Sequence, residues 1–188
     1  VIGLGILQCL RALELTPANL IAVDVSPYRL AVAESLGATM LVDASCEDPL
    51  EKITAVVGTS PLIYYRHLST PNVDISYDCV GYIQDRPEPP ALQHAIELAR
   101  EGSGRVVVHG IFEAAVPLDL ERMVAKQVAV MGSFAFTGEE ISRALRFMAD
   151  GRVDRRSLVT HEPALADARE AFDMQCRVGE CVKVVLEC

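Results

Sequence analysis

Short apolar runs rich in β-branched residues alternate along this sequence with stretches whose apolar residues recur at helical spacing. This alternation is typical of proteins in which helices cover a parallel sheet. Several runs are nearly all apolar, as expected for strands buried on both faces. The sequence therefore predicts an α/β fold with a doubly wound, mostly parallel sheet. The predicted strands are Leu20–Asp24, Thr39–Val42, Ile75–Val80, Arg105–His109, Val128–Gly132, Leu158–His161 and Val182–Leu186.

The helices between these runs carry recognisable start and stop signals. Ser26-Pro27 predicts a helix start, with serine as the cap and proline as the first helical residue, and Gly37 suits the end of that helix. Thr137 and Glu140 have the spacing of a capping box, and Gly151 marks the end of the helix that they begin.

Two segments are longer than the connections of a minimal α/β repeat. Gly58–Asn72 precedes a strand, and we expect it to contact another subunit or nothing, because loops that enter strands lie opposite the ligand edge. Tyr82–Pro90 follows a strand and is therefore predicted to lie at the ligand edge. Pro89-Pro90 then predicts a helix that ends near Gly102.

Charge and composition exclude several classes of partner. The net charge of −9 disfavours binding to nucleic acid and to anionic membranes. No run reaches the roughly 18–20 apolar residues of a membrane-spanning helix. The six cysteines include no C-x-x-C pair, which favours reduced thiols over a metal site. We expect a cytoplasmic protein with neither a nucleic acid nor a membrane partner.

The first residues predict a phosphate-binding turn. We interpret Val1-Ile2 as the remnant of a strand, followed by a tight turn at Gly3 and close backbone approach of a pyrophosphate at Gly5. The helix that follows offers free N–H groups and a favourable dipole to that anion. Gln8 replaces the third glycine of the G-x-G-x-x-G pattern, which leaves the closeness of helix–strand packing open.

Asp24 strengthens this interpretation. It ends the second predicted strand, 21 residues after Gly3, where a carboxylate can accept hydrogen bonds from both hydroxyls of an adenosine ribose. A 2′-phosphate would be repelled there, so NAD is favoured over NADP. Arg29 lies close enough to reach the same ribose, or is a solvated helix charge. Asp24 has an alternative role as a capping residue before Ser26-Pro27.

Three further strand ends break into small or flexible residues on the expected ligand side of the sheet. They are Cys79-Val80-Gly81, His109-Gly110-Ile111 and Gly132-Ser133-Phe134, where backbone groups are expected to hold a nicotinamide ring. The alternative for each is that glycine simply lets the strand end. His109 lies at the same edge and is either a general base or, as strand-end histidines more often are, a structural residue.

In their order these pieces resemble the cofactor-binding domain of the medium-chain, zinc-type alcohol and polyol dehydrogenases. The similar pieces are VIGLGILQ, VDVSPYRLAVAESLGAT, YDCVG, GRVVVHGI, VAVMGSF and KVVLE. The resemblance implies a Rossmann-type, NAD-binding fold over residues 1–188. The cofactor-binding residues that it implies are Gly3, Gly5, Ile6, Leu7, Asp24, Arg29, Val80, Gly81, Gly110, Ile111, Ser133 and Phe134.

The resemblance also implies hydride transfer between NAD and a secondary alcohol or polyol. In that family zinc is held by a separate catalytic domain, which we expect to be missing here, so we assign no catalytic and no metal-ligating residue to this chain. We expect a fragment of a two-domain enzyme with a truncated first strand. Its partners would be a small alcohol or ketone and further copies of itself in a dimer or tetramer. By analogy with the family's dimers, the apolar stretch Ile111–Leu118 would pair across a two-fold axis.

Two other functions stay open at this point. A dinucleotide fold without its catalytic half would suit a module that senses NAD and NADH and regulates a partner. Adenosylmethionine-dependent methyltransferases also use a G-x-G turn and an acidic residue after the second strand, although no methyl-transfer motif is recognisable here.

Overall fold

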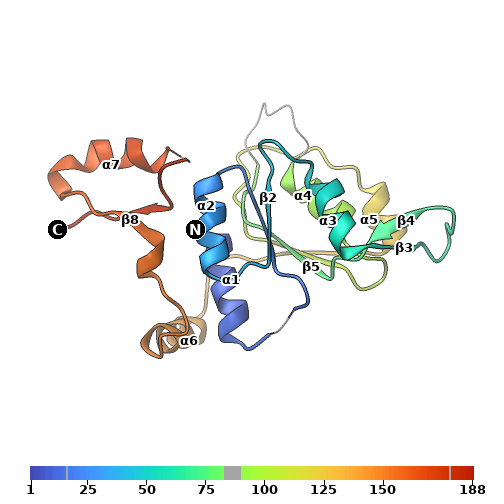
Figure 1. Cartoon of the computed structure of the whole chain (residues 1–188), viewed down its shortest axis with the longest axis horizontal. Helices are drawn as coiled ribbons and strands as arrows, with labels where there is room; N and C mark the ends of the chain where they lie inside the picture. The colour runs from blue at the N-terminus through green and yellow to red at the C-terminus, as the bar shows by residue number, and fades with distance from the viewer. Residues whose placement is uncertain (16, 83–89, 178) are drawn as a thin grey trace. The chain divides into compact units, whose positions relative to one another are not determined.

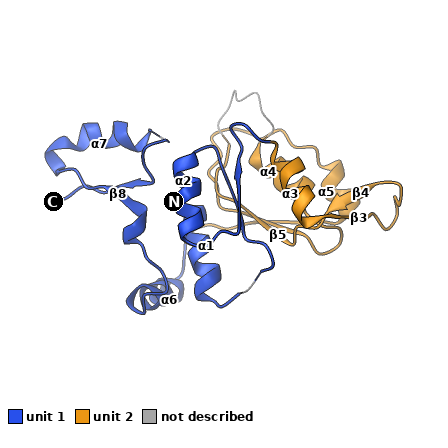
Figure 2. Cartoon of the chain, in the orientation of Figure 1, with its two compact units in different colours: residues 1–47, 136–188 blue, residues 48–135 orange. Residues whose placement is uncertain are grey.

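The computed structural model describes residues 1–15, 17–82, 90–177 and 179–188 (Figure 1). The chain forms two compact units (Figure 2). Unit 1 comprises Val1–Glu47 and Phe136–Cys188, and unit 2 comprises Asp48–Ala135. Parallel strand pairs occur in both units, so the predicted α/β class with mostly parallel sheets is confirmed.

Unit 1 contains two pairs of parallel strands, β1 with β2 and β8 with β9. Its core joins the apolar face of the first helix to the second helix and to the C-terminal segment, through Leu4, Leu7, Ala33, Ala38, Leu158 and Val182. Its elements are α1 (Ile2–Ala12), β1 (Ile21–Asp24), α2 (Pro27–Ser35), β2 (Met40–Asp43), α6 (Gly138–Ala149), η1 (Arg156–Leu158), β8 (Val159–His161), η2 (Leu165–Asp167), α7 (Ala168–Gln175) and β9 (Lys183–Val184).

Unit 2 is built on a three-stranded parallel sheet in the order β5-β6-β7. Helix α4 packs on one face of it, and its core residues are Leu92, Ala95, Ile96, Ala99, Val106 and Val128. The elements of unit 2 are α3 (Pro49–Val57), β3 (Thr59–Pro61), β4 (Ser69–Pro71), β5 (Ile75–Asp78), α4 (Ala91–Leu98), β6 (Arg105–Val108), α5 (Glu121–Lys126) and β7 (Ala129–Gly132).

The predicted strand remnant at Val1-Ile2 is wrong. Helix α1 begins at Ile2, so Gly3 and Gly5 lie in its first turn instead of in a turn before it. The Gly5 N–H donates to the Val1 carbonyl over 2.9 Å, a helical hydrogen bond. No described strand pairs with these two residues. An extended backbone gains no hydrogen bond when it has no neighbouring strand, whereas in the helix the Val1 carbonyl accepts a hydrogen bond.

The predicted helix signals are confirmed. Ser26 caps α2 with Pro27 as its first residue, and Gly37 after the helix has φ of +101°. Thr137 and Glu140 form the complete capping box of α6. The helix predicted after Pro89-Pro90 begins at Ala91 with Pro90 as its cap, while Pro89 lies outside the described residues. It ends at Leu98 and not near Gly102 as predicted, because the backbone is already extended at Ala99.

The long segment Gly58–Asn72 contains an antiparallel hairpin, in which β3 pairs with β4. Leu62 in its loop is 2% exposed. The Asn72 side chain holds the base of the hairpin, because its amide nitrogen donates to the Val57 carbonyl and its oxygen accepts from Ser60. Its expected contact with another subunit stays a prediction. The predicted ligand-edge loop Tyr82–Pro90 lies, apart from its two end residues, outside the described residues.

A buried lysine closes the end of α4. Lys126 is 2% exposed, and its ammonium donates to the carbonyls of Ile96, Glu97 and Ala99 over 2.7–2.9 Å. These carbonyls belong to the last turn of the helix, which has no intrahelical donors for them. Burial lowers the pKa of Lys126 to about 8. The contact ties α5 to α4 and so fixes the helix that covers the sheet.

Among the described residues, no helix combines the length and the apolar character needed to cross a membrane.

The capping box gives unit 1 a defined response to acid. The Thr137 N–H and hydroxyl both donate to the Glu140 carboxylate, which lowers the pKa of Glu140 below its ordinary value of 4.5. A lowered pKa stabilises the fold above the unfolded-state value, and that contribution is lost as the pH falls through the folded-state value. We therefore expect Glu140→Gln to reduce the loss of thermal stability that wild type shows between pH 6 and pH 3.

The measurement is the unfolding temperature of each protein across this pH range. The matched control is Glu139→Gln, which removes the same charge from the same turn. The Glu139 carboxylate pairs with Arg143 and not with the start of the helix. Equal pH profiles for wild type and Glu140→Gln would contradict the assignment.

Candidate functional site

The predicted cofactor residues divide equally between the two units. Unit 1 carries Gly3, Gly5, Ile6, Leu7, Asp24 and Arg29, and unit 2 carries Val80, Gly81, Gly110, Ile111, Ser133 and Phe134.

The first turn of α1 is open above Gly5. A Cβ built on Gly5 meets no atom within 4 Å, so packing does not require glycine there. No side chain caps this end of the helix. Glycine inside a helix is destabilising relative to alanine by roughly 0.5–1 kcal/mol. Its presence is explained if a ligand must approach the backbone of this turn. Leu7, in contrast, is buried in the core of unit 1.

Gln8 has a structural role that its place in the glycine pattern did not predict. Its side chain is 4% exposed and forms two hydrogen bonds with the Asp154 backbone. The amide nitrogen donates to the carbonyl over 3.1 Å, and the Asp154 N–H donates to the amide oxygen over 2.6 Å. The contact joins residues 146 positions apart, and no local sequence signal points to it.

Asp24 ends β1 directly before the start of α2. One carboxylate oxygen accepts the Ser26 N–H over 3.0 Å, so the capping role is real. The other oxygen has no hydrogen-bond partner among the described residues and is not one of their enclosed atoms without a partner. Arg29 is half-buried, and its Nε donates to the Cys181 carbonyl over 3.2 Å. Asp24 therefore keeps one free acceptor, while Arg29 is partly committed to the C-terminal segment.

In unit 2, the structure brings Val80, Gly81, Gly110 and Ile111 together at the carboxyl ends of β5 and β6. A Cβ at Gly81 would overlap the Ile111 backbone, and a Cβ at Gly110 would overlap the backbone of Gly81. Gly81 also has φ of +76°, which favours glycine. The Tyr82 N–H donates to the Ile111 carbonyl over 3.1 Å, so the two chains stay paired beyond their strands.

Three apolar side chains at this edge are exposed to solvent. Val80, Ile111 and Phe134 are 67%, 80% and 98% exposed. Ser133 follows β7, and its N–H donates to the Val108 carbonyl over 2.9 Å, which places the end of β7 beside the end of β6. Exposed apolar residues around backbone polar groups are typical of a surface that receives a flat, partly apolar ligand.

Asp78 organises this edge, and sequence reasoning missed it. Its Oδ1 accepts the N–H groups of Val80 and Gly81 over 3.0 and 3.2 Å. Its backbone carbonyl accepts those of His109 and Gly110 over 2.8 and 3.0 Å. An aspartate followed by small residues at a strand end was the available signal, because such side chains hydrogen-bond the backbone two residues on.

Two reactive side chains near this edge lack the surroundings of catalytic groups. Burial and the neighbouring Asp78 carboxylate raise the pKa of the Cys79 thiol to about 11, so the nucleophilic thiolate is scarce at neutral pH. The His109 ring stacks on Tyr77, with centroids 6.1 Å apart. This contact agrees with the structural alternative for His109.

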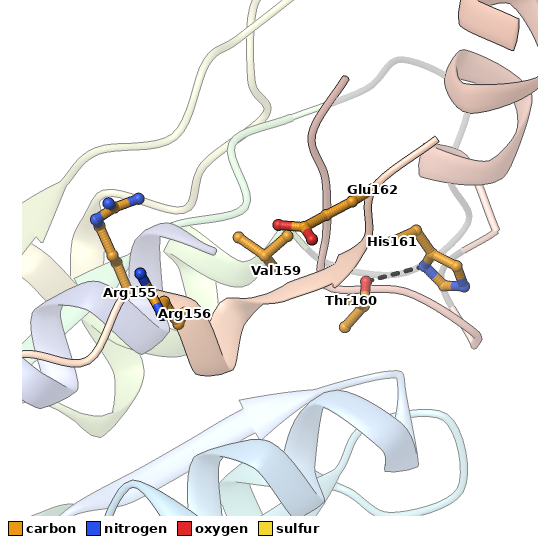
Figure 3. Close-up of a pocket in the computed structure, with 6 residues that line it drawn as sticks. All are labelled: Arg155, Arg156, Val159, Thr160, His161 and Glu162. Atoms are coloured by element: carbon orange, nitrogen blue, oxygen red, sulfur yellow. Dashed lines mark hydrogen bonds between the residues drawn. The ribbon is translucent and has the colours of Figure 1, made fainter. Parts of the chain in front are cut away.

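A cavity of about 590 Å³ lies in unit 1 between η1 and the end of β8 (Figure 3). It is lined by Arg155, Arg156, Val159, Thr160, His161 and Glu162, and contains none of the predicted cofactor residues. Within it the Thr160 hydroxyl contacts the His161 Nδ1 at 3.1 Å (Figure 3). That hydroxyl also bonds the backbone of Val182 and Lys183, so it is not a free nucleophile.

The sequence model of the zinc-binding dehydrogenase family matches residues 1–150 of this chain. An L-idonate 5-dehydrogenase from Vitis vinifera is 27% identical over 186 residues, covering 97% of this chain and 46% of that protein. An L-threonine 3-dehydrogenase from Bacillus velezensis is 30% identical over 174 residues, covering 90% of this chain and 44% of that protein. The chain thus spans about half the length of the curated relatives it matches.

Among solved structures, the chain is similar to 2R,3R-butanediol dehydrogenase from Bacillus subtilis. The TM-score is 0.78 with 25% sequence identity, and the match covers 100% of this chain and 48% of that one. The fold is accordingly that of the Rossmann-type domains of such dehydrogenases. The predicted resemblance is confirmed at the level of the family.

The contact between Gly81 and Gly110 predicts a sharp intolerance to side chains. We expect Gly110→Ala to destabilise the protein by at least about 2 kcal/mol, because the new methyl group overlaps backbone that cannot move without breaking the Asp78 hydrogen bonds. Denaturant unfolding measures this. Gly132→Ala is the control, since a Cβ there meets nothing within 4 Å. Similar losses in the free energy of unfolding for Gly110→Ala and Gly132→Ala would contradict the close approach of Gly81 and Gly110.

Proposed function

Since the chain belongs to the zinc-binding dehydrogenase family, we propose that it is the part of an oxidoreductase that binds NAD. The whole protein then transfers hydride between a secondary alcohol or polyol and this cofactor. The observation that carries the choice of NAD is Asp24, whose second carboxylate oxygen stays free at the end of β1. A free anionic acceptor suits two ribose hydroxyls and repels a 2′-phosphate.

The residues of this chain fit the parts of a dinucleotide. The uncapped first turn of α1 offers N–H groups and the positive end of the helix dipole to a pyrophosphate, with open space above Gly5. Asp24 accepts hydrogen bonds from the adenosine ribose. The terminal guanidinium nitrogens of Arg29, which bond to none of the described residues, add donors. Backbone groups at Val80–Gly81, Gly110–Ile111 and Ser133 hold the nicotinamide end, with the exposed apolar side chains against its ring.

When bound, the nicotinamide supplies the site that accepts or returns the hydride. The chain's own contribution is to bind and orient the cofactor and to exclude water from one face of the ring. Zinc, which the family description implies, has no ligand set among the described residues, where no three His, Cys, Asp or Glu side chains gather. We assign it no step here and propose that residues outside this chain bind it.

We further propose that the substrate is a small alcohol or ketone and that copies of the protein associate with one another. Both proposals rest on the family, whose relatives named above act on small polar molecules by their names.

Calorimetric titration of the chain with NAD, NADP and adenosylmethionine tests the proposal. We expect NAD to bind most tightly of the three. Asp24→Ala should weaken NAD binding by about tenfold, because the hydrogen bonds to the ribose are lost. The ratio of NAD affinity to NADP affinity should also fall. The control is Asp43→Ala at the end of β2, whose carboxylate is occupied by the N–H and hydroxyl of Ser45. Preferred binding of adenosylmethionine, or binding of none of the three, would refute the proposal.

Gly5→Ala separates stability from binding. We expect it to stabilise the protein by about 0.5–1 kcal/mol, since alanine favours the helix and its methyl group meets no protein atom. The same methyl group projects where the pyrophosphate is proposed to lie, so NAD affinity should fall by about tenfold or more. Gly138→Ala, at the equally open start of α6, should stabilise without changing NAD affinity. Unchanged NAD binding by Gly5→Ala would argue against this turn as the phosphate site.

A further inference from the structure

The carboxylate of Asp78 is buried behind the edge at which the nicotinamide is proposed to bind. The residue is 3% exposed. Its Oδ1 is held by the N–H groups of Val80 and Gly81, two residues of the proposed nicotinamide site. The carboxylate is therefore fixed directly beneath the backbone that would contact the ring.

The second oxygen of this carboxylate has no hydrogen-bond partner among the described residues. Asp78 Oδ2 is enclosed, and none of their donors reaches it. A buried carboxylate oxygen without donor or counter-ion is costly, so it is normally retained only where something offsets it. The backbone N–H bonds to Oδ1 satisfy half of the group and leave Oδ2 without a donor among the described residues.

This charge acts on its surroundings. It contributes, after burial, to the raised pKa of the neighbouring Cys79 thiol, because a second negative charge beside the carboxylate is disfavoured. A positive charge placed at the same edge would be favoured for the same reason.

Building on the proposed function, we propose that Asp78 determines the preference of the site for the oxidised cofactor. The nicotinamide ring of NAD⁺ carries a positive charge and that of NADH is neutral. A fixed, unpaired carboxylate behind the ring therefore stabilises NAD⁺ relative to NADH. Asp78 thereby favours release of the reduced cofactor after an alcohol is oxidised.

The test measures by calorimetry the affinities of wild type and of Asp78→Asn for NAD⁺, NADH and ADP-ribose. Asparagine keeps an oxygen for the Val80 and Gly81 N–H groups and removes only the charge. We expect NAD⁺ to bind about tenfold more weakly to Asp78→Asn and NADH to change less than about twofold, the size expected for one unit charge at an effective dielectric constant of about 20. ADP-ribose, which lacks the nicotinamide, should bind both proteins equally.

The matched control is Asp74→Asn, which removes the same charge from an exposed residue just before the opposite end of β5. It should leave the ratio of NAD⁺ to NADH affinity unchanged. If Asp78→Asn does not fold, Asp78→Ser makes the same comparison, because a serine hydroxyl can also accept the N–H two residues on.

Equal weakening of NAD⁺ and NADH, or an unchanged ratio in the neutral variant, would overturn the inference about Asp78 while leaving the proposed function standing. Failure of wild type to bind any of the three ligands would instead refute the proposed function, and the inference with it.

Discussion

The close approach of two backbone segments, at Gly81 and Gly110, is the constraint on which the edge of unit 2 depends. Neither position has room for a Cβ, because each faces backbone atoms of the neighbouring strand end. Asp78 holds both segments, one through its side chain and one through its carbonyl. At these two glycines backbone therefore packs directly against backbone, with no side chain between the two segments.

In unit 1, long-range hydrogen bonds from polar side chains hold the elements of the proposed site. Its proposed ligand groups are the start of α1 and the Asp24 carboxylate before α2, and both helices bond to the C-terminal segment. Gln8 fastens α1 to Asp154, and Arg29 fastens α2 to Cys181. These polar side chains bond to backbone groups far away in sequence, so the positions of α1 and α2 depend on residues beyond 150, where the family model no longer matches. Residues at the predicted cofactor site are therefore also structural ties.

The local parts of this structure were predictable, and the reasons are local. Apolar runs such as Arg105–His109 predict strands by composition alone, and the capping box at Thr137 needs only four consecutive residues. The strand remnant at Val1-Ile2 failed because a strand is stable only when paired, and pairing is not a property of two residues. The Gln8 contact was likewise hidden, since its partner lies 146 residues away.

For Asp78, one feature was predictable from the local sequence and another was not. Its Asx-type turn was visible in the order Asp-Cys-Val-Gly, but its burial was not, because burial depends on how segments far apart in the sequence pack around the residue. Burial converts a common turn residue into a fixed charge, since water no longer screens it. The same aspartate on an exposed strand end would shape the turn equally well and exert little field. The preference for NAD⁺ that we propose thus depends on the burial of Asp78 and not only on the residues exposed at this edge.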